Sequence, residues 1–258
     1  MSNTYILATG EGAKERLEFQ NQLSMELSIQ HLEKAGLKAG MTVLDMGCGV
    51  GAMTNYLAKA VGSNGKVYAV DVSKAQLKIA EEKAKSESID NIVFIESNIY
   101  SNLDIPAVDL IYMRFVLMHI TNPLQALINL KNYLKPNGVV VSQEPIISTF
   151  QAVSGYADIL ISLGKQQNVD YNIGQSSQNL FLEAGYNPVN VEYKQMEITG
   201  QKMKKFCQLS LSEWGNKAVD SGFITIEIIN SLLEKVSLLN ENEEYLSGKQ
   251  AYILAWNN

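Results

Sequence analysis

The sequence predicts an α/β protein with a doubly wound, mostly parallel sheet of seven strands and helical insertions that form a lid and a cap. The first observation is that five short runs rich in valine and isoleucine alternate with amphipathic segments between residues 41 and 145. Strands that alternate with helices form βαβ units, which place parallel strands between helices. The second observation is a glycine-rich stretch directly after the first run, which predicts a ligand-binding turn at that strand's carboxyl end.

The first half of the chain supplies these elements in a regular order. An amphipathic helix is expected over residues 10–35. The apolar runs predict strands at 41–46, 66–72, 91–97, 108–115 and 139–144. The connecting helices are expected at 54–61, after a capping box that begins at Ser73, and after Asn122 and Pro123. Turn residues at 62–65 and 135–138 are expected to separate helices from the next strands.

The second half of the chain has fewer strand-like runs. Helices are expected at 150–167, 176–185, 201–219 and 224–239, and strands that extend the sheet at 188–199 and 248–256. The predicted organisation is an N-terminal lid helix at 1–35 and a ligand-binding domain at 36–258. That domain carries cap insertions at about 146–175 and 200–240.

Composition and charge restrict the possible partners and location. The chain has 258 residues, 21 Lys and Arg against 27 Asp and Glu, and a net charge of −6, which argues against nucleic acid as a partner. The start MSNTYILATG lacks the regions of a secretory signal, and no apolar run approaches the ~20 residues that span a bilayer. We therefore expect a cytoplasmic protein with two free cysteines and no membrane span.

The glycine-rich stretch VLDMGCGVGA contains both an acid and closely spaced glycines. Gly47 and Gly49 let a ligand approach the backbone, and Asp71 at the end of the next strand suits the hydroxyls of a ribose. Two ligands fit this pattern, a dinucleotide and S-adenosylmethionine. Asp45 distinguishes them, because a carboxylate so close to the first glycine repels a pyrophosphate but tolerates a sulfonium or an ammonium.

Four motifs make the chain similar to the class I S-adenosylmethionine-dependent methyltransferases. VLDMGCGVGAMT resembles their glycine-rich motif, and VYAVDVS resembles the ribose-binding motif. VDLIYMRFVLMHITNP and LKPNGVVVSQEP resemble the fourth and post-fourth motifs. The resemblance covers roughly residues 35–145 and is strongest to the small-molecule branch, which includes quinone C-methylating enzymes. It implies a Rossmann-like methyltransferase fold and S-adenosyl-L-methionine as cofactor.

The resemblance also implies cofactor contacts along the edge of the sheet. Backbone atoms of Gly47, Cys48 and Gly49 are expected to line the methionine part, and Asp71 is expected to hold the ribose. The other implied contacts are Val72 and Gln76 beside the ribose, Asn98 and Ile99 around the adenine, Arg114 and Phe115 near the sulfonium, and Tyr5, Arg16 and Gln20 from the N-terminal segment. Asn98 departs from the usual aspartate, which weakens the expected hydrogen bond to the adenine amine.

The acceptor is expected to be a small molecule, but the sequence leaves open which atom is methylated. His119 and Glu144 are the candidates for a general base if a hydroxyl is methylated, and a packed structural role is an open alternative for His119. Five aromatic residues are candidates for a pocket lining or for the core: Phe150, Tyr156, Tyr171, Phe206 and Trp214.

Three rival functions share parts of this pattern. They are an NAD-dependent oxidoreductase, a non-catalytic scaffold that binds S-adenosylmethionine, and a nucleic-acid methylase. The fourth strand ends in YMRF and not in the Asn/Asp-Pro-Pro-Tyr motif of enzymes that methylate nucleic-acid bases. The pattern also contains no acid cluster there for a divalent metal and no zinc spacing, so no metal is expected. A homodimer is possible on sequence grounds.

Overall fold

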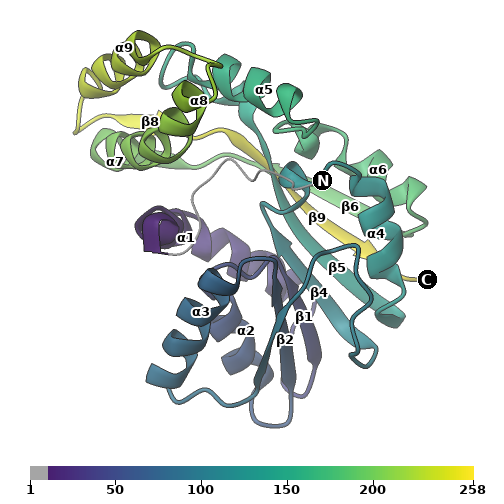
Figure 1. The fold of residues 1–258 in the computed structure, drawn as a ribbon. Helices are drawn as coiled ribbons and strands as arrows, with labels where there is room; N and C mark the ends of the chain where they lie inside the picture. Colours follow the sequence, from purple (N-terminus) through teal and green to yellow (C-terminus); the bar gives the residue numbers. More distant parts are fainter. Residues whose placement is uncertain (1–10) are drawn as a thin grey trace.

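The computed structural model describes residues 11–258 and contains a seven-stranded sheet (Figure 1). The strand order is β3-β2-β1-β4-β5-β9-β6. The strands are β1 (Thr42–Met46), β2 (Lys66–Asp71), β3 (Ile92–Glu96), β4 (Val108–Arg114), β5 (Leu134–Ile146), β6 (Val189–Lys194) and β9 (Lys249–Trp256). Only β9 runs antiparallel to its neighbours β5 and β6. The predicted doubly wound, mostly parallel sheet is confirmed.

Helices cover both faces of this sheet, and the two faces bury different side chains. Val43 packs in a core that includes Leu32 and Leu57, whereas the next residue, Leu44, packs in a core that includes Leu127 and Phe181. This alternation follows the two-residue period of a strand. The helices are α1 (Glu11–Lys34), α2 (Thr54–Val61) and α3 (Lys74–Ser86) on the first face, and α4 (Pro123–Lys131) and α6 (Ser177–Glu183) on the second (Figure 1).

Capping residues predicted two helix starts correctly, but turn residues led to a wrong start for the fifth strand. The side chain of Ser73 accepts a hydrogen bond from the Gln76 N–H, and that of Asn122 accepts one from the Gln125 N–H, so both predicted caps are confirmed. The predicted turn at 135–138 is wrong as a break before β5, because the strand runs from Leu134 to Ile146. Asn137, with φ +62°, and its neighbours form a bulge that shifts the register against β4.

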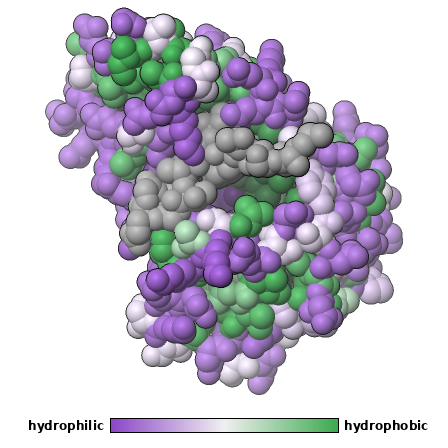
Figure 2. Space-filling model, in the orientation of Figure 1, coloured by the Kyte–Doolittle hydropathy of each residue, from purple (hydrophilic) through white to green (hydrophobic). Residues whose placement is uncertain are grey.

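The cap has its own core above the sheet. Its elements are α5 (Tyr156–Gln166), α7 (Gly200–Ser210), the π-helical segment η4 (Leu211–Gly215), α8 (Asn216–Asp220) and α9 (Ile226–Ser237). They bury Trp214, Leu211 and Met203 together. Figure 2 shows apolar side chains over the cap helices and hydrophilic residues over much of the remaining visible face. Ile226 at the start of α9 and Leu238 directly after this helix are both exposed.

The predicted strand at 188–199 is wrong as a single strand. It splits into β6, in the main sheet, and β7 (Glu197–Thr199), which pairs with the unpredicted β8 (Glu244–Leu246) in a separate two-stranded sheet. The split occurs at Met196, whose N–H donates to the Ser247 hydroxyl and whose carbonyl accepts from the Ser247 N–H. The helix predicted from 150 begins only at Tyr156. The division into a lid at 1–35 and a domain at 36–258 stays a prediction.

Candidate active site

The loop after β1 is shaped by glycine conformations. Gly47 and Gly49 have φ values of +76° and +55°, a region that strongly favours glycine. A Cβ on Gly47 would lie 2.5 Å from Cγ2 of Val116, so this loop also packs closely against the chain after β4. A Cβ on Gly49 would meet only Oε1 of Gln76, at 3.6 Å, so the backbone of Gly49 borders open space. The loop therefore offers bare backbone to a ligand.

Asp71 ties this loop to the end of β2. One carboxylate oxygen accepts from the Gly49 N–H at 2.9 Å, and the other accepts from the Ser73 N–H at 2.8 Å. Burial raises the pKa of Asp71 above its ordinary value, although these N–H donors act in the opposite direction. Each carboxylate oxygen keeps acceptor capacity for a hydroxyl. The structure thus places Asp71 where it can hold both the loop and a ribose.

A shallow groove continues from Asp71 along the sheet edge, and Val72 and Asn98 both line it. Val72 is 64% exposed, which is unusual for a valine and fits a flat apolar contact. The Asn98 side-chain oxygen accepts from the Tyr100 N–H at 2.8 Å, so that oxygen already has a donor. The Ile99 side chain is buried in the core and does not line the groove. The predicted contact of Tyr5 lies outside the described residues.

Two further groups lie at the loop, and their protonation states differ. Burial, together with the carboxylates of Asp45 and Asp71, raises the pKa of the Cys48 thiol well above its ordinary value, so the thiol stays protonated. Burial raises the pKa of Asp45 to about 6, against the hydrogen bond that its carboxylate accepts from Thr54 at 2.6 Å. Asp45 is therefore mostly ionised at neutral pH. Its charge disfavours a phosphate at the loop, which fits a cofactor without phosphates.

Arg114 and Phe115, at the end of β4, contact different parts of the molecule. The Arg114 guanidinium donates to the side chains of Asn21, at 2.8 Å, and Ser28, at 3.3 Å, both on α1. Arg114 therefore ties α1 to the end of β4, and its predicted place near the sulfonium stays a prediction. Phe115, with φ +57°, lines the large cavity described next.

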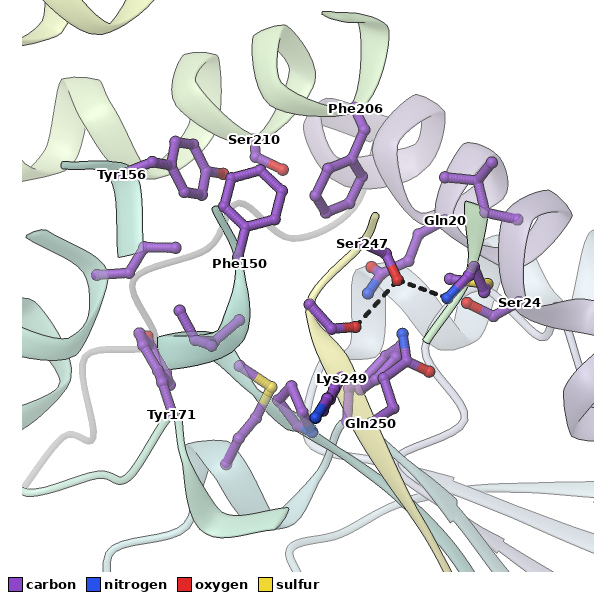
Figure 3. Close-up of a pocket in the computed structure, with 18 of the residues that line it drawn as sticks. Gln20, Ser24, Phe150, Tyr156, Tyr171, Phe206, Ser210, Ser247, Lys249 and Gln250 are labelled. Carbon is purple, nitrogen blue, oxygen red and sulfur yellow. Dashed lines mark hydrogen bonds between the residues drawn. The ribbon is translucent and has the colours of Figure 1, made fainter. Parts of the chain in front are cut away.

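A large cavity lies between the sheet and the cap, and its empty space is about 1060 Å³ including the part open to solvent. Figure 3 shows Phe150, Tyr156, Phe206 and Ser210 on its cap side and Gln250 on the opposite side. All five predicted aromatic residues line it. Other lining residues are Leu23, Met118, Ile147, Leu160, Met196, Ile198 and Met203. The lining is thus mainly apolar and aromatic, as in sites for small organic molecules.

Two charged features interrupt this apolar lining: Lys249 on β9, and a cluster around Arg16 on α1. Arg16 and Gln20, predicted as cofactor contacts, both line the cavity. The Arg16 Nε donates to the Glu213 carboxylate at 2.8 Å, and Nη1 donates to the Gln20 side-chain oxygen at 3.0 Å. The pair with Glu213 joins α1 to the π-helical segment of the cap. Glu213 was not predictable as a site residue, because a single glutamate in a helical stretch carries no signal of its partner 197 residues away.

The structure separates the two predicted bases. His119 lines the cavity and packs edge-on against Tyr171, with ring centroids 5.7 Å apart. Burial and the charge of Arg16 lower the pKa of His119 to about 3, so the imidazole is uncharged at neutral pH. Glu144 is 0% exposed and does not line the cavity. Its carboxylate accepts from three successive N–H groups, those of residues 116, 117 and 118, and so holds the turn that carries His119.

Comparison with known proteins identifies the family. The model of a methyltransferase domain family matches residues 37–210. The chain belongs to this family. That membership confirms the predicted class of enzyme and its cofactor, S-adenosyl-L-methionine, and gives no support to an oxidoreductase. The fit of a phosphate-free cofactor to the loop agrees with it.

Relatives with named activities match part of the chain. A demethylmenaquinone methyltransferase of Staphylococcus aureus is 31% identical over 127 residues, which is 46% of this chain and 51% of that protein. One from Lactococcus lactis is 29% identical over 182 residues, 63% of this chain and 71% of that protein. A ubiquinone/menaquinone biosynthesis C-methyltransferase of Shewanella pealeana is 32% identical over 116 residues, 44% and 46% of the two chains. The chain thus spans about half the length of several curated relatives.

Solved structures support the fold. A SAM-dependent methyltransferase from Aquifex aeolicus has a TM-score of 0.54 and 26% identity, covering 71% of this chain and 92% of that one. A SAM-dependent O-methyltransferase from Thermotoga maritima has a TM-score of 0.53 and 16% identity, covering 90% and 64%. No helix within residues 11–258 is long and apolar enough to cross a membrane.

Proposed function

We propose that this protein transfers a methyl group from S-adenosylmethionine to an apolar, ring-bearing small molecule, of the quinone type named for its relatives. The observation that carries the proposal is the cavity between the sheet and the cap, which is lined mainly by aromatic, Met, Leu and Ile side chains. Such a lining favours a flat apolar body over a small charged amine. We also infer a cytoplasmic location, in keeping with free Cys48 and Cys207.

The cofactor would be held by backbone and side chains of the loop edge. Gly47 and Gly49 would contact its methionine part, Asp71 its ribose, and Val72 with Asn98 its adenine. When bound, the cofactor supplies a methyl group on a positively charged sulfur that is already activated for displacement. Val116 lies against Gly47, and Phe115 beside it lines the cavity, so the loop and the cavity adjoin.

The cavity residues would act mainly by orienting the acceptor and excluding water. Aromatic and thioether side chains would hold the ring in one plane, so that the nucleophilic atom faces the loop beyond Phe115. Alignment of two bound reactants supplies a large share of such a rate enhancement. A carbon or phenolate nucleophile then needs little help from a base, which agrees with the weakly basic His119.

A turnover assay tests this proposal. S-adenosylhomocysteine formation is measured with a demethylated naphthoquinol and, in parallel, with a small polar amine such as sarcosine. We expect turnover with the naphthoquinol and none with the amine. Turnover with the amine alone would overturn the acceptor class, and cofactor binding without turnover on any ring compound would favour the scaffold.

A cavity-filling variant links turnover to the cavity. Met203 is buried on α7 and lines the cavity, so Met203→Trp is expected to abolish turnover while S-adenosylhomocysteine still binds. The matched control is Lys202→Trp on the same helix, which places the indole on the exposed side and is expected to leave turnover unchanged. Equal turnover in both variants would show that the acceptor binds elsewhere.

A further inference from the structure

The charged cluster in the cavity contains one nitrogen without a partner. Arg16 is only 5% exposed, and within the described residues its Nη2 is buried with no hydrogen-bond partner. Buried guanidinium nitrogens are costly to leave unsatisfied, because the lost hydration is not replaced. Arg16 also lines the cavity, so a molecule bound there that carries an oxygen atom would offer this nitrogen a partner.

The other two nitrogens of Arg16 fix the direction of the guanidinium. Nε donates to Glu213, which is itself buried, and Nη1 donates to Gln20, one helical turn further along α1. Because a guanidinium is planar, two such contacts hold the third nitrogen in place. Glu213 belongs to the π-helical segment η4, an irregularity that is frequent at functional sites.

We propose that Nη2 of Arg16 donates a hydrogen bond to a carbonyl or phenolate oxygen of the methyl acceptor, and so selects ring compounds that carry such an oxygen. This inference rests on the proposed function, and it moves Arg16 from the cofactor to the acceptor. A hydrogen bond from a cationic donor strengthens as negative charge gathers on the acceptor oxygen. Arg16 therefore favours the oxyanion form of a ring hydroxyl, which is the more nucleophilic form.

Two probe molecules of equal shape test the inference. 1-Naphthol and 1-methylnaphthalene differ by a hydroxyl in place of a methyl group, and their dissociation constants are measured by equilibrium dialysis. We expect the wild-type protein to bind 1-naphthol about tenfold or more tightly than 1-methylnaphthalene, the effect of one charge-assisted hydrogen bond.

Two variants assign that preference to Nη2. The double variant Arg16→Met/Glu213→Leu removes both buried charges while keeping apolar volume, so the fold is retained. It is expected to bind the two probes equally, with the affinity for 1-methylnaphthalene unchanged. Glu213→Gln keeps an oxygen for Nε and leaves Nη2 in place, so it is expected to retain the preference for 1-naphthol. The affinity for S-adenosylhomocysteine is expected to be the same in all three proteins.

The outcomes separate this inference from the proposed function. If the wild-type protein binds both probes equally, or the double variant keeps the preference, the inference is wrong while the acceptor class stands. If the double variant loses affinity for S-adenosylhomocysteine and keeps the preference, Arg16 belongs to the cofactor. If Glu213→Gln loses the preference for 1-naphthol over 1-methylnaphthalene, that preference depends on the charge of Glu213 and not on Nη2 of Arg16. If neither probe binds the wild-type protein, the proposed function fails and the inference fails with it.

Discussion

The loop edge of the sheet and the cap cavity are built in opposite ways. At the loop edge, the candidate binding groups are backbone atoms and one carboxylate, and the residues involved lie close together in sequence, as with Gly49 and Asp71. In the cavity, side chains from α1, α5, α7 and β9 meet, and its charged pair joins residues 197 positions apart. A binding loop built from backbone can therefore be recognised as a sequence motif, whereas a cavity built from side chains far apart in sequence cannot.

The largest effect on ligand binding is expected from removing the acid of the loop edge. Asp71→Ala deletes a carboxylate that also holds Gly49, so we expect affinity for S-adenosylhomocysteine to fall about a hundredfold or more, measured by calorimetry. Binding of 1-naphthol in the cavity is expected to stay unchanged. Asp109→Ala is the control, because Asp109 contacts Thr42 and Lys135 at the opposite ends of the strands. Equal loss in both variants would end the distinction between the two regions.

The next effect compares the buried ion pair of the cavity with an exposed ion pair outside both regions. Glu213→Leu leaves the buried Arg16 without its partner, and we expect the free energy of unfolding to fall by about 3–5 kcal/mol. Lys34→Ala breaks an exposed pair with Glu192, both 48% exposed, and is expected to cost about 1 kcal/mol or less. Denaturant titration measures both. A cost for Glu213→Leu as small as that for Lys34→Ala would show that the cap does not bury its charges.

A pH dependence is expected at the junction of the two regions. Burial raises the pKa of Glu144 from 4.5 to about 7, against the N–H groups that it accepts from. Its contribution to stability is therefore fully present below pH 4.5 and is lost as the pH rises through 7, by about 3 kcal/mol. Glu144→Gln cannot titrate, so the difference in unfolding free energy between the two proteins should change over this range. If the difference in unfolding free energy stays constant with pH, the pKa of Glu144 is not raised.

The smallest effect is expected at His119. With a pKa of about 3 the imidazole is a weak base, so we expect His119→Gln to lower kcat less than about tenfold. In the wild-type protein, kcat should also show no change between pH 5 and 8 that arises from the titration of His119. If His119→Gln loses nearly all turnover, and kcat of the wild-type protein changes with a pKa near 6.5, then His119 is the general base that the sequence suggested.

The fold was predictable where local rules and packing agree. The alternation of apolar runs and helical periods predicted the sheet, and the caps at Ser73 and Asn122 fixed helix starts, because these signals act within a few residues. The small sheet of β7 and β8 was not predictable, since its three-residue strands carry no period. The bulge at Asn137 was predicted as a turn, because residues that adopt positive φ occur both in turns and in bulges.

The site was predictable at the loop edge and only partly in the cavity. The motif predicted that Gly47, Gly49 and Asp71 lie together at the strand ends, and the structure places them so, because their positions depend on local backbone geometry. Their contacts with the cofactor stay predictions. The aromatic residues of the cavity were suggested by type alone. The contacts of Arg114 with Asn21 and Ser28 on α1 were not predictable, because no local pattern encodes them.

The position of β9 has a consequence for synthesis of the chain. This strand lies between β5 and β6, yet it is translated after both of them. A nascent chain that has left the ribosome only as far as residue 248 therefore exposes two unpaired strand edges, which are templates for aggregation. Until β9 is inserted, β5 and β6 are not joined in one sheet, and chaperones that shield such edges would act in this interval.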